Sequence, residues 1–378
     1  MLRAAVIADS HFDQHSRFEE CIRLHEWIRA DAAARDVDLV LHSGDVYERK
    51  STPLEREAVA EWVQGMAAIA PVVIVRGNHD ALGDLPLLER LEAPHKITVV
   101  EEARIVHAAG VQVVCVAWPR KAALLAACGA ESHEAGEATA AEALRNVLRG
   151  LGAQLQDEPG PNALLMHAMV RDSITSTGQP LVGCDMEIGL EDLALVGADT
   201  YLLGHIHRSQ AFRVGDSIAI YPGSPRRANF GELEAKGYTL VTWHDDATVS
   251  LEFIEVPATP MLHISALWQG SLLHYDYVSV AGAEVRLRYT TPSDTREAAK
   301  AAAANLREEL LAAGAVSVQV EELVIAEQRA RSPELAKALT LDEKIAALWT
   351  AKGYAPDAVR RSALLDKVHG LEELANAS

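Results

Sequence analysis

Cysteine is scarce in this chain of 378 residues, and no two cysteines form a Cys-x-x-Cys pair. The four cysteines are Cys21, Cys115, Cys128 and Cys184. Their wide spacing argues against a thiolate zinc site and predicts reduced, mostly buried thiols. No apolar run approaches the length of about 20 residues that a membrane-spanning helix needs. The first strand is expected to begin at residue 3, which leaves no room for a signal peptide, so we expect a cytoplasmic protein without a membrane partner.

Basic residues are also too few to balance the acidic ones. The chain has 35 Lys and Arg residues against 54 Asp and Glu residues, which gives a formal net charge of −19. A protein that binds nucleic acid by charge alone needs a basic face, so this composition argues against that mode of binding. Much of the acidic surplus lies in segments such as 131–142 and 321–322, away from the motifs described below. The length is sufficient for two or three domains.

Five short apolar runs each lead into residues with metal-binding side chains. The runs, at residues 4–8, 39–41, 72–75, 163–166 and 201–203, are rich in Val, Ile and Leu, as buried strands are. The polar residues that follow them are Asp9, His11, Asp45, Asn78, His79, Asp80, His167, His205 and His207. Loops beyond the carboxyl ends of strands in an open α/β sheet border one crevice, so we expect these side chains to converge.

The backbone beside these residues is predicted to have two special properties. Side chains alternate along an extended segment, so Asp9 and His11 are expected to point together, as are His205 and His207. Sharp turns next to the site are expected at three glycines, which are Gly44, Gly77 and Gly204.

The mixture of carboxylate, amide and imidazole ligands suits a pair of divalent first-row ions. Two ions about 3.5–4 Å apart can share a hydroxide, lower its pKa and present it in line with a phosphorus atom. The sequence therefore predicts a two-metal hydrolase with water as the nucleophile. Ser10 and Ser43 flank ligand residues, but they are expected to make turn hydrogen bonds and not to act as nucleophiles.

The Gly-Asn-His-Asp motif at residues 77–80 and the Gly-His-Ile-His motif at residues 204–207 resemble those of calcineurin-like metallophosphoesterases. The resemblance spans roughly the first 250 residues and implies an α/β fold, a two-layer β-sandwich flanked by helices. It implies that one ion is held by Asp9, His11 and His207, the other by Asn78, His167 and His205, and that Asp45 bridges them. It also implies that His79 stabilises or protonates phosphoryl or leaving oxygens, while Asp80 holds its imidazole in the useful tautomer.

A narrower resemblance concerns the segment Tyr-Pro-Gly-Ser-Pro-Arg-Arg-Ala-Asn-Phe-Gly-Glu at residues 221–232. This segment, with stretches 42–49 and 199–210, is similar to the SbcD family, the nuclease subunits of bacterial SbcCD repair complexes. The resemblance implies hydrolysis of DNA ends or hairpins with two Mn²⁺ ions. Arg226 and Glu48 are departures from the usual family pattern. For Arg226 and Arg227 we consider contact with DNA phosphates, and a solvated surface pair is the alternative.

Three domains are expected, a catalytic domain at residues 1–257, a capping domain at 258–330 and a helical segment at 331–378. The catalytic domain should contain a helix at 16–34, a strand at 111–117, a loop at 150–161, and antiparallel edge strands at 238–243 and 248–255. Trp118 is expected to pack inside the protein and not to stack on bases. In the second domain, strands at 285–289 and 316–325 and a helix at 295–312 predict a β-α-β module. The resemblance implies that this module caps the active site, and simple packing on the first domain is the alternative.

The last segment is predicted to form amphipathic helices. Their apolar stripes consist of Leu341, Ile345, Leu348 and Trp349, and of Val359, Leu364, Leu365, Val368 and Leu371. Two short helices cannot bury such stripes alone, so they must pack on the body of the protein or on a partner. The resemblance implies a partner, an SbcC-like ATPase subunit with a coiled coil. The sequence leaves open whether the chain forms a homodimer.

The function expected from these patterns is that of a metal-dependent DNA nuclease, a phosphodiesterase that serves as the nuclease subunit of an SbcCD-like repair complex. One alternative is a two-metal phosphoesterase that acts on a small molecule or a phosphoprotein. Another is a non-catalytic scaffold for DNA ends, against which the complete ligand set argues. The sequence does not distinguish exonuclease from endonuclease action.

Overall fold

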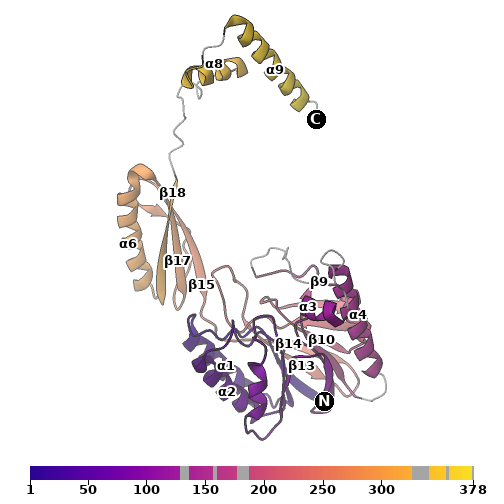
Figure 1. Cartoon of the computed structure of the whole chain (residues 1–378). Coiled ribbons are helices and arrows are strands. Elements are labelled where there is room, and N and C mark those ends of the chain that lie inside the picture. The colour runs from indigo at the N-terminus through magenta and orange to yellow at the C-terminus, as the bar shows by residue number, and fades with distance from the viewer. Residues whose placement is uncertain (128–135, 156–159, 177–186, 326–339, 355–356, 377–378) are drawn as a thin grey trace. The chain divides into compact units, whose positions relative to one another are not determined.

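The computed structural model describes residues 1–127, 136–155, 160–176, 187–325, 340–354 and 357–376 (Figure 1). The chain divides into two compact units. The first comprises Met1–Ile264, Tyr277–Leu287 and Arg307–Gln319, and the second comprises Ser265–Asp276, Arg288–Leu306 and Val320–Ser378. The domain boundaries expected at residues 257 and 330 stay predictions. Among the described residues, no helix is both long and apolar enough to cross a membrane.

The first six-stranded sheet has the order β14-β13-β1-β2-β3-β4. Its strands are β1 (Leu2–Ile7), β2 (Leu39–His42), β3 (Val72–Val75), β4 (Ile97–Val100), β13 (Gly237–Trp243) and β14 (Val249–Glu255). The strands β1 to β4 are parallel, and β13 runs antiparallel to β1. The expectation that β13 is an edge strand was wrong. It lies between β14 and β1, so all its residues are buried, and only β14 forms the edge.

Two helices cover the outer face of this sheet, α1 (Phe18–Ala34) and α2 (Pro53–Ala67). In α1, helical spacing places Cys21, Leu24 and Ile28 on one buried face. They pack with Ala5 and Ile7 of β1 in one apolar cluster. Thr52 and Glu55 cap the start of α2 with reciprocal hydrogen bonds. The helix expected at residues 16–34 and its place between two parallel strands are confirmed.

The second six-stranded sheet has the order β11-β12-β10-β7-β6-β5. Its strands are β5 (Arg104–Ala108), β6 (Val111–Val116), β7 (Asn162–His167), β10 (Thr200–Gly204), β11 (Gln210–Val214) and β12 (Ser217–Tyr221). Shorter elements around the two sheets are η1 (Leu85–Arg90), α3 (Lys121–Ala127), β8 (Met169–Val170), β9 (Glu187–Ile188), α5 (Leu190–Leu193) and η2 (Ala194–Val196). The helix α4 (Gly136–Leu155) packs on this sheet through a buried stripe that includes Leu144, Leu148 and Leu151. A loop was expected from residue 150, but Leu151 and Leu155 extend the apolar stripe, so the helix continues to Leu155.

The two sheets pack face to face through a third apolar cluster. In β1, Ala4 and Val6 point into this inter-sheet cluster, whereas Ala5 and Ile7 point toward the helices. Val113 of β6 and Leu165 of β7 approach from the other sheet. Each fully buried Leu, Ile or Val side chain contributes about 1.5–3 kcal/mol. The architecture is therefore the expected two-layer β-sandwich flanked by helices.

A third sheet has four strands in the order β16-β15-β17-β18. The strands are β15 (Met261–Trp268), β16 (Leu273–His274), β17 (Glu284–Pro292) and β18 (Ser317–Ile325), with η3 (Ser293–Thr295) and α6 (Arg296–Ala312) between the last two. Figure 1 shows α6 lying along this sheet. The β-α-β elements were expected, but β15 and β16 were missed because they alternate only weakly in sequence.

Two further helices are α8 (Leu341–Ala351) and α9 (Ala358–Asn376). The stripe expected on α9 is not borne out in full, because Val359 lies on the opposite face of the helix from Leu364 and Val368, and α9 is only weakly amphipathic. Thr340 and Glu343 form a capping box at the start of α8. Leu348, Val359 and Leu364 are 41%, 80% and 36% exposed. The side chains of Leu341 and Leu371 fall outside the described residues.

The described cysteines, Cys21 and Cys115, are free and buried, as expected. Burial raises the pKa of the Cys21 thiol to about 12, so it is protonated at neutral pH. Cys128 and Cys184 lie outside the described residues.

Of the three glycines at which a sharp turn was expected, Gly44 has a φ of 97°. Gly204, the last residue of β10, is instead required by the close approach of other parts of the chain. A Cβ atom there would lie 2.3 Å from the carbonyl oxygen of Ser43 and 2.8 Å from Nδ1 of His167. Only a residue without a Cβ atom fits this close to both Ser43 and His167.

We predict that Gly204→Ala lowers the free energy of unfolding by about 1–3 kcal/mol, because the added methyl group meets main-chain atoms that cannot move aside. Urea unfolding followed by circular dichroism measures this change. The matched control is Gly150→Ala in α4, where nothing lies within 4 Å of the new Cβ atom. That variant should gain stability, by at most about 1 kcal/mol. Equal stability of the two variants would contradict the steric argument.

Candidate metal centre

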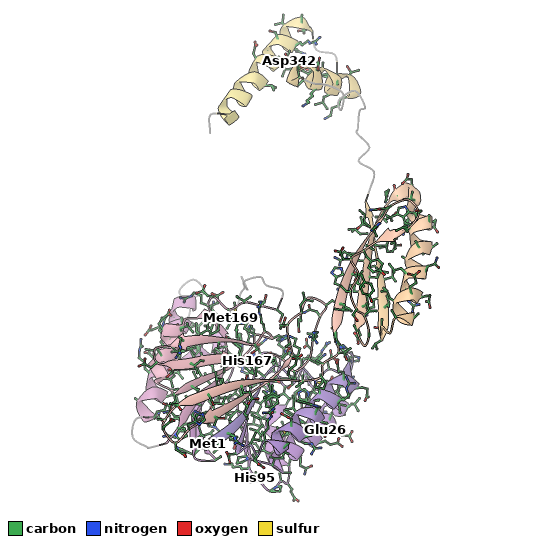
Figure 2. All side chains as sticks on the ribbon, turned by 180° about the vertical axis from the view of Figure 1, so that it is seen from behind. Met1, Glu26, His95, His167, Met169 and Asp342 are labelled. Atoms are coloured by element: carbon green, nitrogen blue, oxygen red, sulfur yellow. The ribbon has the colours of Figure 1, made fainter. Side chains whose placement is uncertain are left out.

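Strands of both sheets deliver polar residues to one place at the carboxyl ends of β1, β2, β3, β7 and β10. Asp9 and His11 follow β1, Asp45 follows β2, Asn78, His79 and Asp80 follow β3, His167 ends β7, and His205 and His207 follow β10. His167 lies in the interior of the first unit and is 0% exposed (Figure 2). The expected convergence is therefore confirmed, although it involves two facing sheets and not one.

The loops that carry these residues are not extended. Asp9, His11 and Asp45 have φ angles of 52°, 46° and 56°, in the left-handed region, and His205 has a φ of 112°. The argument from alternating side chains was therefore wrong, because it assumes extended backbone. It fails visibly for His205 and His207, whose imidazoles join different clusters. Such unusual backbone persists only where surrounding contacts determine it.

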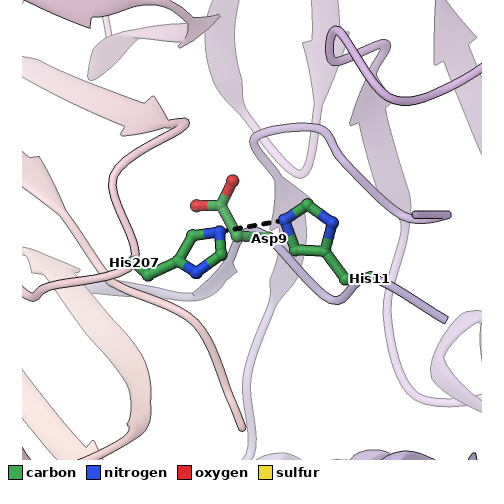
Figure 3. Close-up of side chains that lie close together, drawn as sticks. All are labelled: Asp9, His11 and His207. Atoms are coloured by element: carbon green, nitrogen blue, oxygen red, sulfur yellow. Dashed lines mark hydrogen bonds between the residues drawn. The ribbon is translucent and has the colours of Figure 1, made fainter. Parts of the chain in front are cut away.

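The first cluster consists of Asp9, His11 and His207 (Figure 3). Nε2 of His11 lies 3.0 Å from Nε2 of His207. Two nitrogen ligands that each lie about 2.1 Å from one ion, at a right angle, are about 3 Å apart. The carboxylate of Asp9 accepts hydrogen bonds from the main-chain N–H of His205 at 3.0 and 3.1 Å. The spacing therefore fits a single ion held by the three side chains.

The second cluster consists of Asp45, His167 and His205, and Asn78 joins it. Oδ1 of Asn78 lies 2.9 Å from Nε2 of His167 and 3.1 Å from Nδ1 of His205. Oδ2 of Asp45 lies 3.4 Å from Nε2 of His167 and 3.8 Å from Nε2 of His11. Asp45 thus stands between the two clusters, where a bridging carboxylate belongs.

Burial and mutual charge shift the pKa values of these groups in opposite directions. Burial raises the pKa of Asp9. Burial would also raise the pKa of Asp45, but the nearby imidazole of His167 holds it far below its ordinary value. Burial would lower the pKa of His167, but the carboxylate of Asp45 raises it to about 9. Burial lowers the pKa of His205 to about 3, and His167 adds to this effect. A positive ion bound at this place would stabilise the ionised carboxylate of Asp45, as the protonated imidazole of His167 does in its absence.

The expected role of Asp80 is corrected by the structure. Its carboxylate accepts hydrogen bonds from the main-chain N–H groups of Asp45, Tyr47 and Gly77, each at 2.9 Å. Nδ1 of His79 instead lies 2.7 Å from the carbonyl oxygen of Glu48. The hydrogen bonds of the Asp80 carboxylate are made with main-chain N–H groups and not with His79. The carbonyl oxygen of Glu48 therefore orients the imidazole of His79.

Arg226 also has a different role from either one considered. Arg226 is 4% exposed, and its guanidinium donates to the carbonyl oxygens of Ser10, His11 and Ser16. The guanidinium of Arg227 donates to four carbonyl oxygens, which belong to Glu232, Glu234, Ala258 and Thr259. A buried guanidinium group needs such acceptors, so Arg226 links loops from the interior, whereas Arg227 is half-buried. Arg226 is therefore not part of a solvated surface pair, and contact of Arg227 with DNA phosphates stays a prediction.

Ser10 is part of a buried network and not a nucleophile. Its Oγ lies 2.8 Å from Nε2 of His42 and 2.7 Å from Nε2 of His25. Nδ1 of His42 accepts from the main-chain N–H of Gly44, and Nδ1 of His25 lies 2.7 Å from the carbonyl oxygen of Cys21. The side chains of Ser10, His25 and His42 are 0% exposed, so the network connects α1 to the metal-site loops without reaching substrate. Trp118 is partly buried and packs on His205 at 5.0 Å between ring centroids. The expectation that it does not stack on bases stays a prediction.

Three residues of the site were missed or given no role by the sequence, namely Glu48, Glu232 and Lys236. Oε2 of Glu48 lies 2.8 Å from Nδ1 of His11, and Oε1 of Glu232 lies 3.4 Å from Nδ1 of His207. Lys236 is 1% exposed and forms an ion pair with Glu232 at 2.6 Å. The only signal for the last two was their place within the motif-like segment after β12.

Comparison with known proteins identifies the class to which this fold and site belong. Residues 2–209, more than half of the chain, match the family of calcineurin-like phosphoesterases, and the chain belongs to this family. Members of the family hydrolyse phosphoesters with divalent metal ions, and the two clusters supply suitable ligands.

Two similar curated proteins are both named DNA double-strand break repair protein Mre11. The protein of Halobacterium salinarum is 24% identical over 263 residues, which are 66% of this chain and 59% of that protein. The protein of Methanosarcina mazei is 23% identical over 279 residues, which are 71% of this chain and 40% of that protein. The chain therefore spans only part of the length of these relatives.

Solved structures with a partly similar backbone include GAP50, the anchor in the inner membrane complex of Plasmodium. It has a TM-score of 0.44 and 13% identity, and the match covers 67% of this chain and 84% of that chain. Another is TT1561 of Thermus thermophilus, with a TM-score of 0.41 and 13% identity over 67% of this chain and 98% of that chain.

We predict that binding of Mn²⁺ at pH 7 releases protons. The raised pKa of His167, about 9, means that its imidazole is protonated at pH 7 before metal binds, whereas an imidazole ligand must be neutral. Metal affinity should therefore increase from pH 6 to pH 9. Calorimetric titrations in two buffers with different ionisation enthalpies measure the released protons. At pH 10, where His167 is already neutral, the release should be smaller, and a buffer-independent enthalpy at pH 7 would contradict the assignment.

Proposed function

We propose that this protein is a DNA nuclease that hydrolyses phosphodiesters with two divalent ions, most suitably Mn²⁺. The observation that supports it best is the position of Asp45, whose Oδ2 lies within 4 Å of imidazoles from both clusters. One carboxylate between two ligand groups is the arrangement that a two-metal hydrolytic centre needs. The similarity to two proteins named for DNA double-strand break repair supports DNA as the substrate.

The chemistry can be described from the residues of the chain. When bound, the ions would supply an activated water and neutralise charge on the phosphate. Asp9, His11 and His207 would hold one of them, Asn78, His167 and His205 the other, and Asp45 both. With Nδ1 of His79 donating to the carbonyl oxygen of Glu48, Nε2 is the nitrogen that can meet a phosphoryl or leaving oxygen. The side chain of His79 is 38% exposed, as contact with a large substrate requires.

A second candidate is a two-metal phosphoesterase that acts on a small molecule or a phosphoprotein. The internal position of Arg226 and the net charge of −19 favour it, because both reduce the attraction for a polyanion. A non-catalytic scaffold for DNA ends is disfavoured by the assembled ligand set.

We predict that the purified chain with Mn²⁺ degrades linear duplex DNA or opens DNA hairpins faster than it hydrolyses cyclic nucleotides or phosphotyrosine. End-labelled DNA, separated on denaturing gels, measures the cleavage. Intact DNA together with rapid hydrolysis of a small phosphoester would establish the second candidate instead.

Two variants show whether the cleavage comes from this centre. Asp45→Asn should abolish hydrolysis of every substrate, since the charge shared between the two ions is lost. His79→Ala should keep its metal, measured by elemental analysis, while turnover falls by about two to four orders of magnitude. Cleavage that survives Asp45→Asn would point to a contaminating nuclease.

We also propose that α8 and α9 dock on an ATPase subunit with a coiled coil, as in an SbcCD-like complex. The supporting observation is that Leu348 of α8 and Leu364 of α9, which belong to the expected apolar stripes, are exposed. A partner helix could cover these stripes through the usual packing of apolar side chains into a groove.

We predict that the double variant Leu348→Ser, Leu364→Ser loses co-purification with a co-expressed SbcC-like ATPase subunit, and loses ATP stimulation of duplex cleavage. Its metal-dependent activity on short single strands should stay unchanged, because neither residue is among the proposed metal ligands. The matched control is Leu87→Ser in η1, an equally exposed leucine at 49%. Unchanged affinity of the double variant for the ATPase would refute docking through these stripes.

A further inference from the structure

We propose that Glu48 and Glu232 are positioning residues that hold the imidazoles of His11 and His207 in the orientation needed for metal binding. The inference rests on the proposed two-metal function and concerns its first cluster. Neither glutamate contributes a ligand atom in this proposal. Each acts on the far side of an imidazole ring, through the nitrogen that does not face the ion.

The two rings have the same arrangement of contacts. In His11, Nδ1 lies 2.8 Å from Oε2 of Glu48, and Nε2 faces the centre. In His207, Nδ1 lies 3.4 Å from Oε1 of Glu232, and Nε2 again faces the centre. The two Nε2 atoms lie 3.0 Å apart, the spacing expected of neighbouring ligands.

This arrangement determines the tautomer of each ring. A neutral imidazole carries its proton on one nitrogen only. Glu232 makes a hydrogen bond with Nδ1 of His207, and the carboxylate of Glu48 lies at ion-pair distance from Nδ1 of His11. A carboxylate beside Nδ1 favours the tautomer with the proton on that nitrogen, so the lone pair is left on Nε2, where an ion can bind it. Such carboxylate–imidazole pairs also fix the ring angle and make the ligand more basic.

The two carboxylates are themselves held differently. Glu232 is 1% exposed and accepts from the main-chain N–H of Ala228 at 3.1 Å, from Nδ2 of Asn229 at 3.0 Å and from Lys236 at 2.6 Å. The side chain of Glu48 is 34% exposed. A substitution at Glu48 can therefore change its carboxylate contact without disturbing buried packing.

Glu48 also connects the first cluster to His79. Its carboxylate contacts His11, whereas its main-chain carbonyl oxygen lies 2.7 Å from Nδ1 of His79. The carboxylate also approaches Nδ1 of His79, with Oε1 at 3.8 Å, but the hydrogen bond to His79 is made by the main chain of Glu48. Loss of the Glu48 carboxylate should thus weaken metal binding and leave the hydrogen bond to His79 in place.

The test measures Mn²⁺ affinity of the full chain without any substrate, by calorimetry and by the electron paramagnetic resonance signal of free Mn²⁺. We expect Glu48→Ala to weaken one of the two binding events by about 10- to 100-fold, and the other by less than about threefold. Glu232→Gln keeps an acceptor for Nδ1–H but loses the negative charge, so it should weaken the same binding event by less than Glu48→Ala does. Glu48→Gln retains an acceptor for Nδ1–H, so it should recover part of the affinity lost in Glu48→Ala. Thermal unfolding of each metal-free variant checks that the fold is intact.

The matched control is Glu234→Gln. Glu234 forms an ion pair with Lys236 at 2.7 Å, as Glu232 does, but no ion pair links it to His207 among the described residues. The Glu234→Gln variant should bind both ions with wild-type affinity. Wild-type affinities in both Glu48→Ala and Glu232→Gln would overturn the positioning role, as would equal losses in Glu234→Gln and Glu232→Gln. Because no DNA is present, a chain that binds two ions but does not cut DNA would refute the nuclease proposal and leave this result standing.

Discussion

The metal centre depends on one buried carboxylate that is not a ligand. Asp80 accepts hydrogen bonds from the main-chain N–H groups of Asp45, Tyr47 and Gly77, and so ties together the loops after β2 and β3. Burial of an ionised carboxylate costs free energy unless hydrogen-bond donors surround it. The hydrogen bonds to Asp80 also fix the positions of the main-chain groups that donate them. Asp45 is thereby held with a left-handed backbone, and its side chain lies between the two clusters. Gly77 permits the close contact, since a Cβ atom there would lie 2.1 Å from Oδ1 of Asp45.

The segment after β12 supports this centre from the opposite side. Arg226 binds the carbonyl oxygens of Ser10 and His11, and Glu232 lies beside Nδ1 of His207. Lys236 compensates the buried charge of Glu232. The polar residues of this segment therefore contact the loops and imidazoles of the candidate metal centre.

The sequence was sufficient to identify most of the site. Val- and Ile-rich runs followed by Asp, Asn or His indicated strands with metal ligands at their carboxyl ends, and those residues do meet. The roles of Asp80 and Arg226 were assigned wrongly, because their partners are main-chain groups far away in sequence. The network of Ser10, His25 and His42 carries no motif at all. Asp9 and His11 do point into the same cluster, as expected, but side-chain alternation is not the reason, because both residues have left-handed backbone.

The sequence by itself indicated the five strands that lead to the ligands, the helix α1 and the chemical types of the ligands, because these follow from local periodicity and from the donor atoms of each residue. The family resemblance implied that His205 and His207 belong to different metal sites, but only the tertiary structure decided that Glu48 and Glu232 lie behind imidazoles. The physical reason is that these relations depend on how two sheets pack face to face. Residues about 200 positions apart meet there at distances near 3 Å, and no local pattern encodes such a distance.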